Sequence, residues 1–285
     1  MSIVHVNGAD CYYEDSDEYH DSDEYHDSDE HADRSSERPA IVFLHGAWAG
    51  CRYFDAQLSG LSPPYRTVAF DFRGHGRSDK TEIGHTIGQY ARDVDAMFRA
   101  LSLEDLVIVG WSLGALVSWE YLDRFGTDRV RALVEVDMEP CPVERADNPY
   151  GSYSVEGLRE LNRGLQSDPD AVIERSIDKL LADPTSKRLR TVMYDEMSRT
   201  PPSIKSAMLL ELLCDYREVL PAIDVPTLVC AGTDEKWRSV PAVEYAAELI
   251  PDASVELFEE SGHCLTIEEP DRFTRVVADF VESIH

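Results

Sequence analysis

Apolar and polar positions alternate in a regular rhythm along most of the chain. From residue 40 onward, the runs AIVFL, TVAFDF, LVIVG and RALVEV have the length and the Val and Ile content of buried strands. Between them, segments 87–101 and 113–125 place apolar residues every three to four positions, as amphipathic helices do. Strands that alternate with helices in this way predict parallel βαβ units, and therefore an α/β fold with a mostly parallel central sheet flanked by helices.

The rhythm is interrupted after the sixth predicted strand, where helical patterns replace strands for about eighty positions. Two predicted strands, PTLVCAG and SVELFEES, and a final helix then restore it. We therefore predict a core made of residues 1–138 and 222–285, with a helical insertion over residues 139–221. The predicted helical segments of the insertion are 155–165, 169–182, 186–199 and 203–216.

The start of the chain predicts a β-hairpin followed by a segment of different character. SIVHVNGADCYYE alternates around an Asn-Gly pair, which is a strong signal for a tight hairpin turn. Residues 14–38 then carry twelve acidic and two basic side chains and hardly any aliphatic residue. Such a segment buries too little surface to offset its ordering entropy, so we expect a disordered, solvated insertion.

Within this acidic insertion, the unit DSDEYH is repeated nearly three times, which raises the question of metal binding. Carboxylates and imidazoles are metal ligands, but the repeat lacks a turn glycine, a fixed loop and surrounding residues that would orient the ligands. We therefore expect no metal site and no direct role of the repeat in catalysis.

The overall charge narrows the classes of partner. The chain has 55 Asp and Glu against 27 Lys and Arg, for a net charge of −28, and five of the basic residues are lysines. This charge repels nucleic acid and anionic membrane surfaces, so neither is an expected partner. The bias toward arginine on a carboxylate-rich chain predicts a halophilic protein with an acidic surface, adapted to a salt-rich cytoplasm.

Cysteine usage and apolar content bear on localisation. The six cysteines form no CxxC pair, and no apolar stretch approaches the roughly eighteen residues that a membrane span needs. The N-terminus has no basic start followed by an apolar run, as a signal peptide would. We expect reduced thiols and a cytoplasmic location.

GWSLG, residues 110–114, lies where a predicted strand turns directly into a predicted helix. This G-x-S-x-G pattern is typical of a nucleophile elbow, in which the glycines leave room for a tight turn that exposes a serine hydroxyl. Ser112 is therefore the candidate nucleophile. An ordinary turn serine is the alternative, but the strand-turn-helix setting favours the nucleophile.

A second loop, FLHGAW (residues 43–48), follows an earlier predicted strand and predicts an oxyanion hole. A backbone N–H in this turn can point at the negative charge that develops on a carbonyl oxygen, so the expected donors are the N–H groups of Ala47 and Leu113. His45 is expected to brace the loop by hydrogen bonds rather than to act as a base. Trp48 and Trp111 are the candidate substrate contacts.

ESGHCL, residues 260–265, supplies the candidate general base. His263 follows the last predicted strand and precedes the final helix, and apart from the terminal His285 it is the one histidine after the elbow. In the chain order nucleophile, acid, histidine, a base belongs at this position.

Together, FLHG, DFRGHGRS (residues 71–78), GWSLG and SGH occur in the order and spacing of the α/β-hydrolase superfamily, which the chain resembles from Ile3 to its end apart from the acidic insertion. The resemblance is to members with a serine nucleophile, such as esterases and metal-free haloperoxidases. It implies an α/β-hydrolase fold in which the helical insertion after strand six is a cap over the pocket. It also implies that Arg73 and His75 belong to a structural turn.

The acid that orients His263 is left open between two positions. Relatives commonly carry it after strand seven as Gly-x-x-Asp, whereas this chain has Asp234 two residues past Gly232 and Glu235 three residues past it. The other position is Asp137 at the end of strand six, an arrangement that resembles some relatives, including cofactor-free dioxygenases. We favour Asp137 slightly over Asp234, with Glu235 third.

These residues predict a cofactor-free serine hydrolase with a Ser-His-Asp triad that cleaves a small carboxylic ester, a lactone or a related acyl compound. One alternative keeps the fold and the triad and uses them for perhydrolysis or cofactor-free oxygenation. A second alternative is a non-catalytic ligand-binding or interaction protein. Neither the identity of the substrate nor the oligomeric state follows from the sequence.

Overall fold

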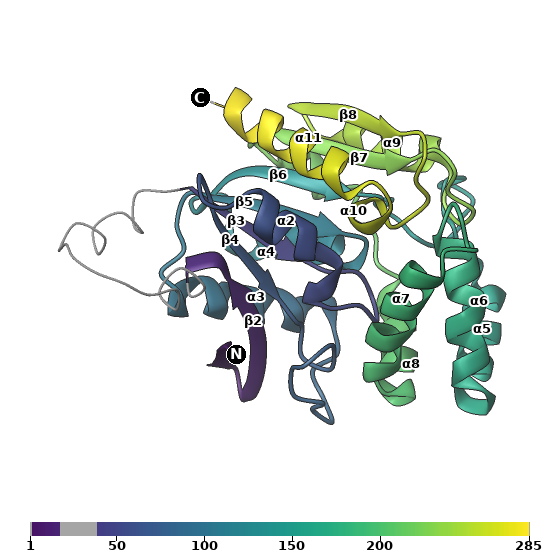
Figure 1. Ribbon diagram of the computed structural model, residues 1–285. Helices are drawn as coiled ribbons and strands as arrows, with labels where there is room; N and C mark the ends of the chain where they lie inside the picture. Colours follow the sequence, from purple (N-terminus) through teal and green to yellow (C-terminus); the bar gives the residue numbers. More distant parts are fainter. Residues whose placement is uncertain (1, 18–38, 285) are drawn as a thin grey trace.

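A mixed eight-stranded sheet forms the centre of the computed structural model, which describes residues 2–17 and 39–284 (Figure 1). The strands are β1 (Ser2–Val6), β2 (Ala9–Asp15), β3 (Ala40–Leu44), β4 (Arg66–Phe70), β5 (Leu106–Trp111), β6 (Val130–Val136), β7 (Thr227–Gly232) and β8 (Ala253–Phe258). Their spatial order is β1-β2-β4-β3-β5-β6-β7-β8. The pairs β1/β2 and β2/β4 are antiparallel and the remaining pairs are parallel, which confirms the predicted α/β architecture.

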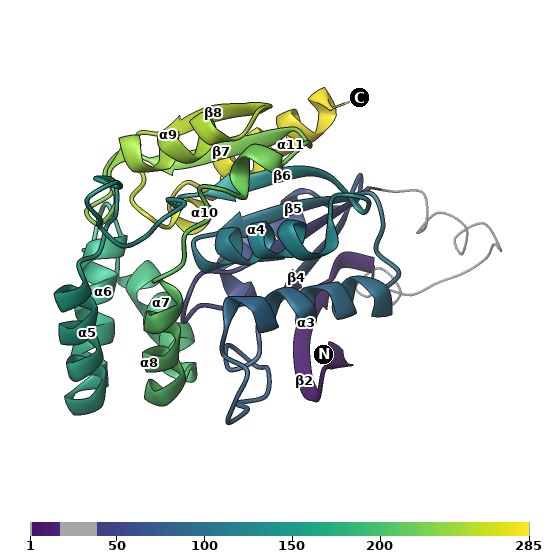
Figure 2. The same cartoon turned by 180° about the vertical axis from the view of Figure 1, so that it is seen from behind.

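Helices cover both faces of this sheet. Their bounds are α2 (Asp55–Gly60), α3 (Ile87–Ala100), α4 (Leu113–Phe125), α9 (Val240–Leu249), α10 (Leu265–Glu268) and α11 (Pro270–Ser283). Helices α2, α10 and α11 lie on one face (Figure 1), and α3, α4 and α9 lie on the other (Figure 2). The central strands are therefore enclosed on both sides, and this is why their sequences are nearly continuous apolar runs.

The N-terminal hairpin forms as the Asn-Gly pair predicts. Asn7 and Gly8 have φ angles of 48° and 79°, the left-handed values that a two-residue type I′ turn requires. Strand β2 continues to Asp15, whose carboxylate pairs with Arg66 of β4 at 2.6 Å. Regular structure therefore extends past residue 14, the expected start of the acidic insertion. The rest of that insertion, residues 18–38, lies outside the described residues.

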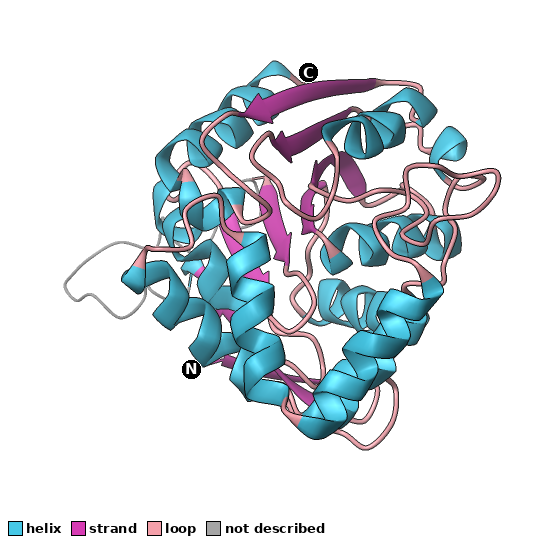
Figure 3. Cartoon of the chain, turned by 90° about the vertical axis from the view of Figure 1, so that its right-hand side faces the viewer, coloured by secondary structure: helices cyan, strands magenta, loops and turns pink. Residues whose placement is uncertain are grey.

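Four helices occupy the segment between β6 and β7, as the sequence predicts. They are α5 (Val155–Ser167), α6 (Pro169–Leu180), α7 (Lys187–Arg199) and α8 (Pro202–Glu211). They gather at one end of the sheet rather than on its faces (Figures 1 and 3). No helix in the part of the chain that the structure describes is long and apolar enough to span a membrane.

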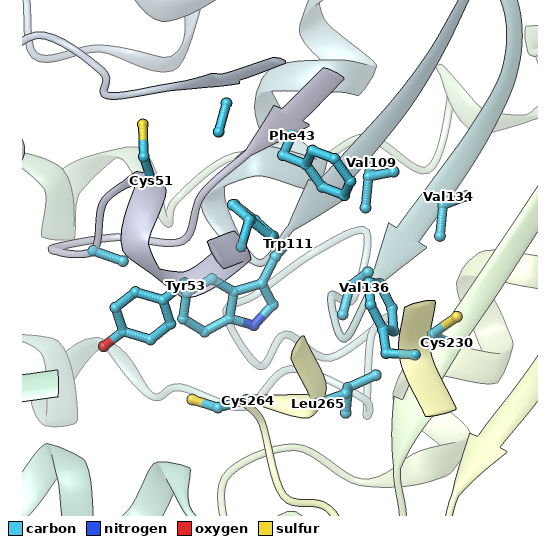
Figure 4. Packing of buried hydrophobic residues seen from close by; sticks show 14 of the residues in the cluster. Phe43, Cys51, Tyr53, Val109, Trp111, Val134, Val136, Cys230, Cys264 and Leu265 are labelled. Atoms are coloured by element: carbon cyan, nitrogen blue, oxygen red, sulfur yellow. The ribbon is translucent and has the colours of Figure 1, made fainter. Parts of the chain in front are cut away.

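A tightly packed apolar core lies on the α11 face of the sheet (Figure 4). Phe43 of β3 and Val109 of β5 are fully buried in it. Trp111, the last residue of β5, stacks on Tyr53 with the ring centroids 4.8 Å apart. This packing holds the end of β5 rigidly, and the residue that follows is Ser112.

Candidate active site

The loops of the site leave the sheet at the carboxyl ends of neighbouring parallel strands. The N–H of Ser112, just after β5, donates to the carbonyl oxygen of Val136 at 2.9 Å. The N–H of Asp137, just after β6, donates to the carbonyl oxygen of Cys230 of β7 at 2.9 Å. Both residues therefore continue the hydrogen-bond ladder of the sheet, and they emerge at the edge where α/β folds build their sites.

Ser112 is held at a strained turn between β5 and α4. Its φ of 54° and ψ of −112° are outside the regions that non-glycine residues favour, and such a conformation persists only when the surroundings enforce it. The motif glycines make room for the turn. A Cβ on Gly110 would lie 2.6 Å from the Ser118 hydroxyl, and one on Gly114 would overlap the carbonyl oxygen of Leu44. The local geometry is that of a nucleophile elbow.

The expected oxyanion donors are the backbone N–H groups of Ala47 and Leu113. Neither N–H donates to a backbone carbonyl in the described part of the chain. Leu113 is the first residue of α4, so its N–H is one of the donors that a helix leaves unpaired at its start. Ala47 lies in the turn after β3, and both residues line the same pocket as Ser112. Two N–H donors beside a nucleophile are what an oxyanion hole requires.

His45 braces this turn, as the sequence indicates. Its Nε2 accepts a hydrogen bond from the N–H of Phe72 at 3.0 Å, so the ring proton is on Nδ1, which donates to the carbonyl oxygen of Gly46 at 2.7 Å. Burial lowers the pKa of His45 and keeps the ring neutral. Both ring nitrogens are therefore engaged in the scaffold.

The backbone of His263 is fixed from two directions. Its carbonyl oxygen accepts a hydrogen bond from the indole N–H of Trp111 at 2.8 Å, so the residue before Ser112 holds the histidine loop. Its N–H donates to the carbonyl oxygen of Leu180, at the end of α6, at 2.9 Å. Trp111 also lines the pocket, but its polar atom is occupied by this bond.

Glu268 ties the same loop to the helical insertion. Its carboxylate accepts hydrogen bonds from the backbone N–H groups of Ala182 at 2.7 Å, Gly262 at 3.1 Å and Cys264 at 3.0 Å. Ala182 follows α6, whereas Gly262 and Cys264 flank His263. One carboxylate therefore fixes both the end of α6 and the loop that carries the histidine.

Two carboxylates converge on Nδ1 of His263. Oδ2 of Asp137 lies 2.6 Å from this nitrogen, and Oε2 of Glu235 lies 3.1 Å from it. The N–H of Trp237 donates to the other oxygen of Glu235 at 2.7 Å and holds that side chain in place. Asp234 is exposed, and its side chain makes no contact with His263 among the residues that the structure describes. The structure therefore brings Asp137 and Glu235 to the histidine, but not Asp234.

Burial and charge together set the ionisation of this cluster. Burial raises the pKa of Asp137 to about 8, and the negative charge of Glu235 adds to the shift. Burial also acts to raise the pKa of Glu235, but the positive charge of His263 outweighs it and lowers that pKa to about 2. The two shifts are linked, because a negative charge on either carboxylate opposes ionisation of the other, whereas a positive charge on His263 favours ionisation of both.

A buried ion pair beside the histidine was not identified from the sequence. Nε of Arg238 pairs with the carboxylate of Glu139, and both side chains are almost fully buried. Nη1 of Arg238 lies 3.1 Å from Nδ1 and 3.3 Å from Nε2 of His263. Nothing in the sequence marks the pair, because its members lie 99 residues apart in polar loops.

The pKa of His263 results from opposing effects of these neighbours. Burial and the positive charge of Arg238 lower it, whereas the charges of Glu235 and Asp137 raise it by more. The net pKa lies above the ordinary value for histidine. The imidazole is therefore more basic than an isolated one, which suits a proton acceptor.

One pocket joins these groups. Ser112 and His263 reach it from the loops after β5 and β8 and so line a common cavity, together with Arg238. Trp48, at a φ of 63°, lines it beside Ala47. The insertion contributes a mostly apolar wall made of Tyr153, Leu161, Leu180, Met197, Met208 and Leu209.

Among the described residues, side chains that could together hold a metal ion lie around His263. Asp137, Glu235 and His263 offer ligand atoms that lie within 4.8 Å of one another. The guanidinium of Arg238 lies against the same imidazole, and its positive charge opposes a cation there. The cluster is thus better suited to holding a proton on His263 than to holding a metal ion.

Comparisons with known proteins agree with this geometry. A non-heme haloperoxidase from Rhodococcus erythropolis is 30% identical over 264 residues, which are 88% of this chain and 94% of that protein. A 2-(acetamidomethylene)succinate hydrolase from Mesorhizobium japonicum is 26% identical over 257 residues, which are 86% of this chain and 88% of that protein. The esterase EaEST from Exiguobacterium antarcticum shares the fold, with a TM-score of 0.87 over 99% of each chain at 24% identity.

The family model described as "Alpha/beta hydrolase family" matches residues 41–276. The match begins in β3 and ends in α11, so it contains the oxyanion turn, the elbow, the whole helical insertion and the histidine loop. The chain therefore belongs to the alpha/beta hydrolase family and is an enzyme of that family.

Proposed function

We propose that this protein is a serine hydrolase that cleaves a small carboxylic ester or lactone through an acyl-enzyme. One observation carries the proposal: Ser112, at a strained elbow, shares a pocket with His263, whose Nδ1 is bound by Asp137. Acyl transfer needs a nucleophile, a base and an acid that orients the base, and these are the three groups present.

In the acylation step, the hydroxyl oxygen of Ser112 attacks the carbonyl carbon of the substrate while its proton moves to Nε2 of His263. The carbonyl oxygen takes the electron pair and is held by the N–H groups of Ala47 and Leu113. The bond to the leaving oxygen then breaks, and the alcohol departs with the proton from His263. Water repeats the sequence on the acyl-enzyme and releases the carboxylic acid.

Asp137 is the residue that we assign to orient His263, because its contact with Nδ1 is the shorter of the two. Glu235 lies beside the same nitrogen at 3.1 Å, and its charge helps to stabilise the imidazolium that forms during acylation. Arg238 acts in the opposite direction and favours the neutral base at rest. Asp234 has no part in this assignment.

We assign residues 139–221 to a cap and residues 1–138 and 222–285 to the catalytic core. The insertion supplies most of the apolar wall of the pocket, with methionine and leucine side chains from α5 to α8. Such a wall suits a short acyl chain, whereas the polar groups that perform the chemistry come from the core.

Labelling with a fluorophosphonate, which reacts with activated serines, tests the assignment. We expect the label on Ser112, together with loss of 4-nitrophenyl acetate hydrolysis. Ser112→Ala is expected to remain unlabelled and to retain less than about one thousandth of the parent turnover. Ser176→Ala removes another serine from the pocket wall, where its hydroxyl bonds to the carbonyl oxygen of Val172, and is expected to keep both properties. A Ser112→Ala variant that hydrolyses esters as fast as the parent would contradict the proposal.

A second candidate is perhydrolysis, which is favoured by the name of the haloperoxidase relative at 30% identity. Hydrogen peroxide would then attack the acyl-enzyme in place of water and release a peracid. Halide oxidation measured in acetate buffer with peroxide reports the peracid, and ester hydrolysis without peroxide gives the reference rate. Peracid formation that is faster than hydrolysis would favour this candidate, and its absence would favour the esterase.

A further inference from the structure

Lys205 is a buried lysine whose charge is not paired with an acidic side chain among the described residues. It lies on α8 and is 2% exposed. Its ammonium group forms no hydrogen bond or ion pair with any residue that the structure describes, whereas its backbone N–H continues the helix. A buried charge is ordinarily paired, because an unpaired one loses its hydration without compensation. Its position therefore calls for a partner that is not part of the chain.

Trp48 presents a second unsatisfied polar group beside it. The ammonium nitrogen of Lys205 lies 5.8 Å from the centre of the Trp48 ring. Trp48 is 5% exposed and lines the pocket, and its indole N–H is buried without a hydrogen-bond acceptor. The buried indole N–H of Trp48, which lacks an acceptor, and the ammonium of Lys205 therefore lie close together, one from the oxyanion turn and one from α8.

Lys205 shares the buried face of α8 with two residues that line the pocket. Met208 and Leu209 lie three and four residues further along, and both line the pocket. Residues at these spacings share one face of a helix, so the lysine follows the same face. The negative charge of Asp170, at the start of α6, acts on Lys205 from a distance. Asp170 is exposed and forms no ion pair with Lys205.

We propose that Lys205 and Trp48 form a subsite for a carboxylate on the substrate, so that the preferred substrates are half-esters or lactones that carry a second, ionised carboxyl group. A carboxylate has two acceptor oxygens, one for the ammonium and one for the indole N–H. Charge-assisted hydrogen bonds to a desolvated carboxylate are among the strong ones in proteins. The proposal rests on the proposed ester hydrolysis and adds the chemical class of the substrate.

Two matched substrates test the proposal. Mono-4-nitrophenyl glutarate carries a free carboxylate, and methyl 4-nitrophenyl glutarate has the same acyl chain with that carboxylate capped as a methyl ester. We expect the parent to prefer the free acid in kcat/KM by about 30-fold. Lys205→Met, which keeps an unbranched apolar side chain, is expected to abolish this preference and to leave hydrolysis of the methyl ester within about threefold. Trp48→Phe replaces the indole with a smaller aromatic ring that has no N–H donor, and is expected to reduce the preference about fivefold.

Lys187→Met is the matched control, because it removes an exposed lysine from the same insertion. It is expected to keep the parent preference, which separates the local contact from the overall charge. An equal loss on both substrates in Lys205→Met, or a parent that prefers the capped ester, would overturn the proposal.

A binding measurement tests the carboxylate subsite independently of ester hydrolysis. Ser112→Ala is titrated with monomethyl glutarate in a calorimeter, alone and combined with Lys205→Met. If Ser112→Ala binds the ligand and the double variant does not, the result supports the subsite. This holds even if the parent cleaves no ester, in which case the proposed function fails and the subsite stands. Binding that is absent from Ser112→Ala, or equal in the two proteins, overturns the subsite.

Discussion

The unpaired charge of Lys205 predicts that Lys205→Met makes the protein more stable at neutral pH. Burial lowers the pKa of Lys205 from 10.5 to about 8, and Asp170 offsets only part of this effect. In the unfolded chain the lysine keeps its ordinary pKa. The folded state therefore binds fewer protons than the unfolded state between pH 8 and 10.5, so the free energy of unfolding rises with pH across that window. Below pH 8 the full cost of the buried charge remains.

The magnitude follows from the size of the shift. A pKa that falls from 10.5 to about 8 corresponds to roughly 3 kcal/mol at about 1.36 kcal/mol per pKa unit. Partial access of the ammonium to solvent reduces this figure, so we expect a gain of about 2 kcal/mol in the variant. A gain of this size is large, because a whole domain is stabilised by only about 5–15 kcal/mol.

Urea denaturation of the parent, Lys205→Met and Lys187→Met at pH 7 and near pH 10.5 measures the effect. At pH 7 we expect Lys205→Met to be the more stable protein, and at the higher pH we expect most of the gap to close, because the lysine is then neutral in the folded state and about half neutral in the unfolded chain. The control at residue 187 is expected to track the parent within about 0.5 kcal/mol. A variant that is less stable than the parent at pH 7, or a gap that does not change with pH, would refute the reasoning.

The remaining predictions concern the acid, the base and the surface charge. Asp137→Asn is expected to lose about 10³–10⁴ in kcat, Glu235→Gln about 10-fold to 100-fold, and Asp234→Asn less than twofold; loss of activity in the last variant alone would contradict the assignment. The rate is expected to rise with pH, with its midpoint at the raised pKa of His263, since the base must be neutral. Glu235→Gln is expected to move the midpoint of this pH profile to lower pH, because it removes a negative charge that raises the pKa of His263. With a net charge of −28, the protein is expected to unfold at a higher urea concentration in about 2 M KCl than in about 0.05 M KCl, and the opposite order would argue against salt adaptation.

The parts of the fold that the sequence predicted well are those with a local signal. The central strands are buried on both faces, so each is a continuous apolar run that cannot be read as a surface element. The Asn-Gly turn and the elbow at Ser112 depend on backbone conformations that few residue types adopt, and those residues are visible in the sequence. Helices α2 and α10 are short and have too few periodic positions to be recognised.

The contacts within the site depend on tertiary structure, so they were harder to predict from the sequence. Asp234 and Glu235 are adjacent in one loop, and the fold decides which of them turns toward His263. Arg238 and Glu139 are ordinary polar residues until β6 and β7 bring them together. Lys205 is equally inconspicuous in the sequence, because a lysine in an amphipathic helix ordinarily faces solvent.

The three hydrogen bonds that Glu268 accepts have a consequence for selectivity. An oversized substrate that wedges α6 outward also drags the imidazole of His263 out of line with the hydroxyl of Ser112. We expect such a compound to bind and yet to react slowly, so that it inhibits the enzyme. We therefore expect the size of a substrate to affect kcat as well as KM.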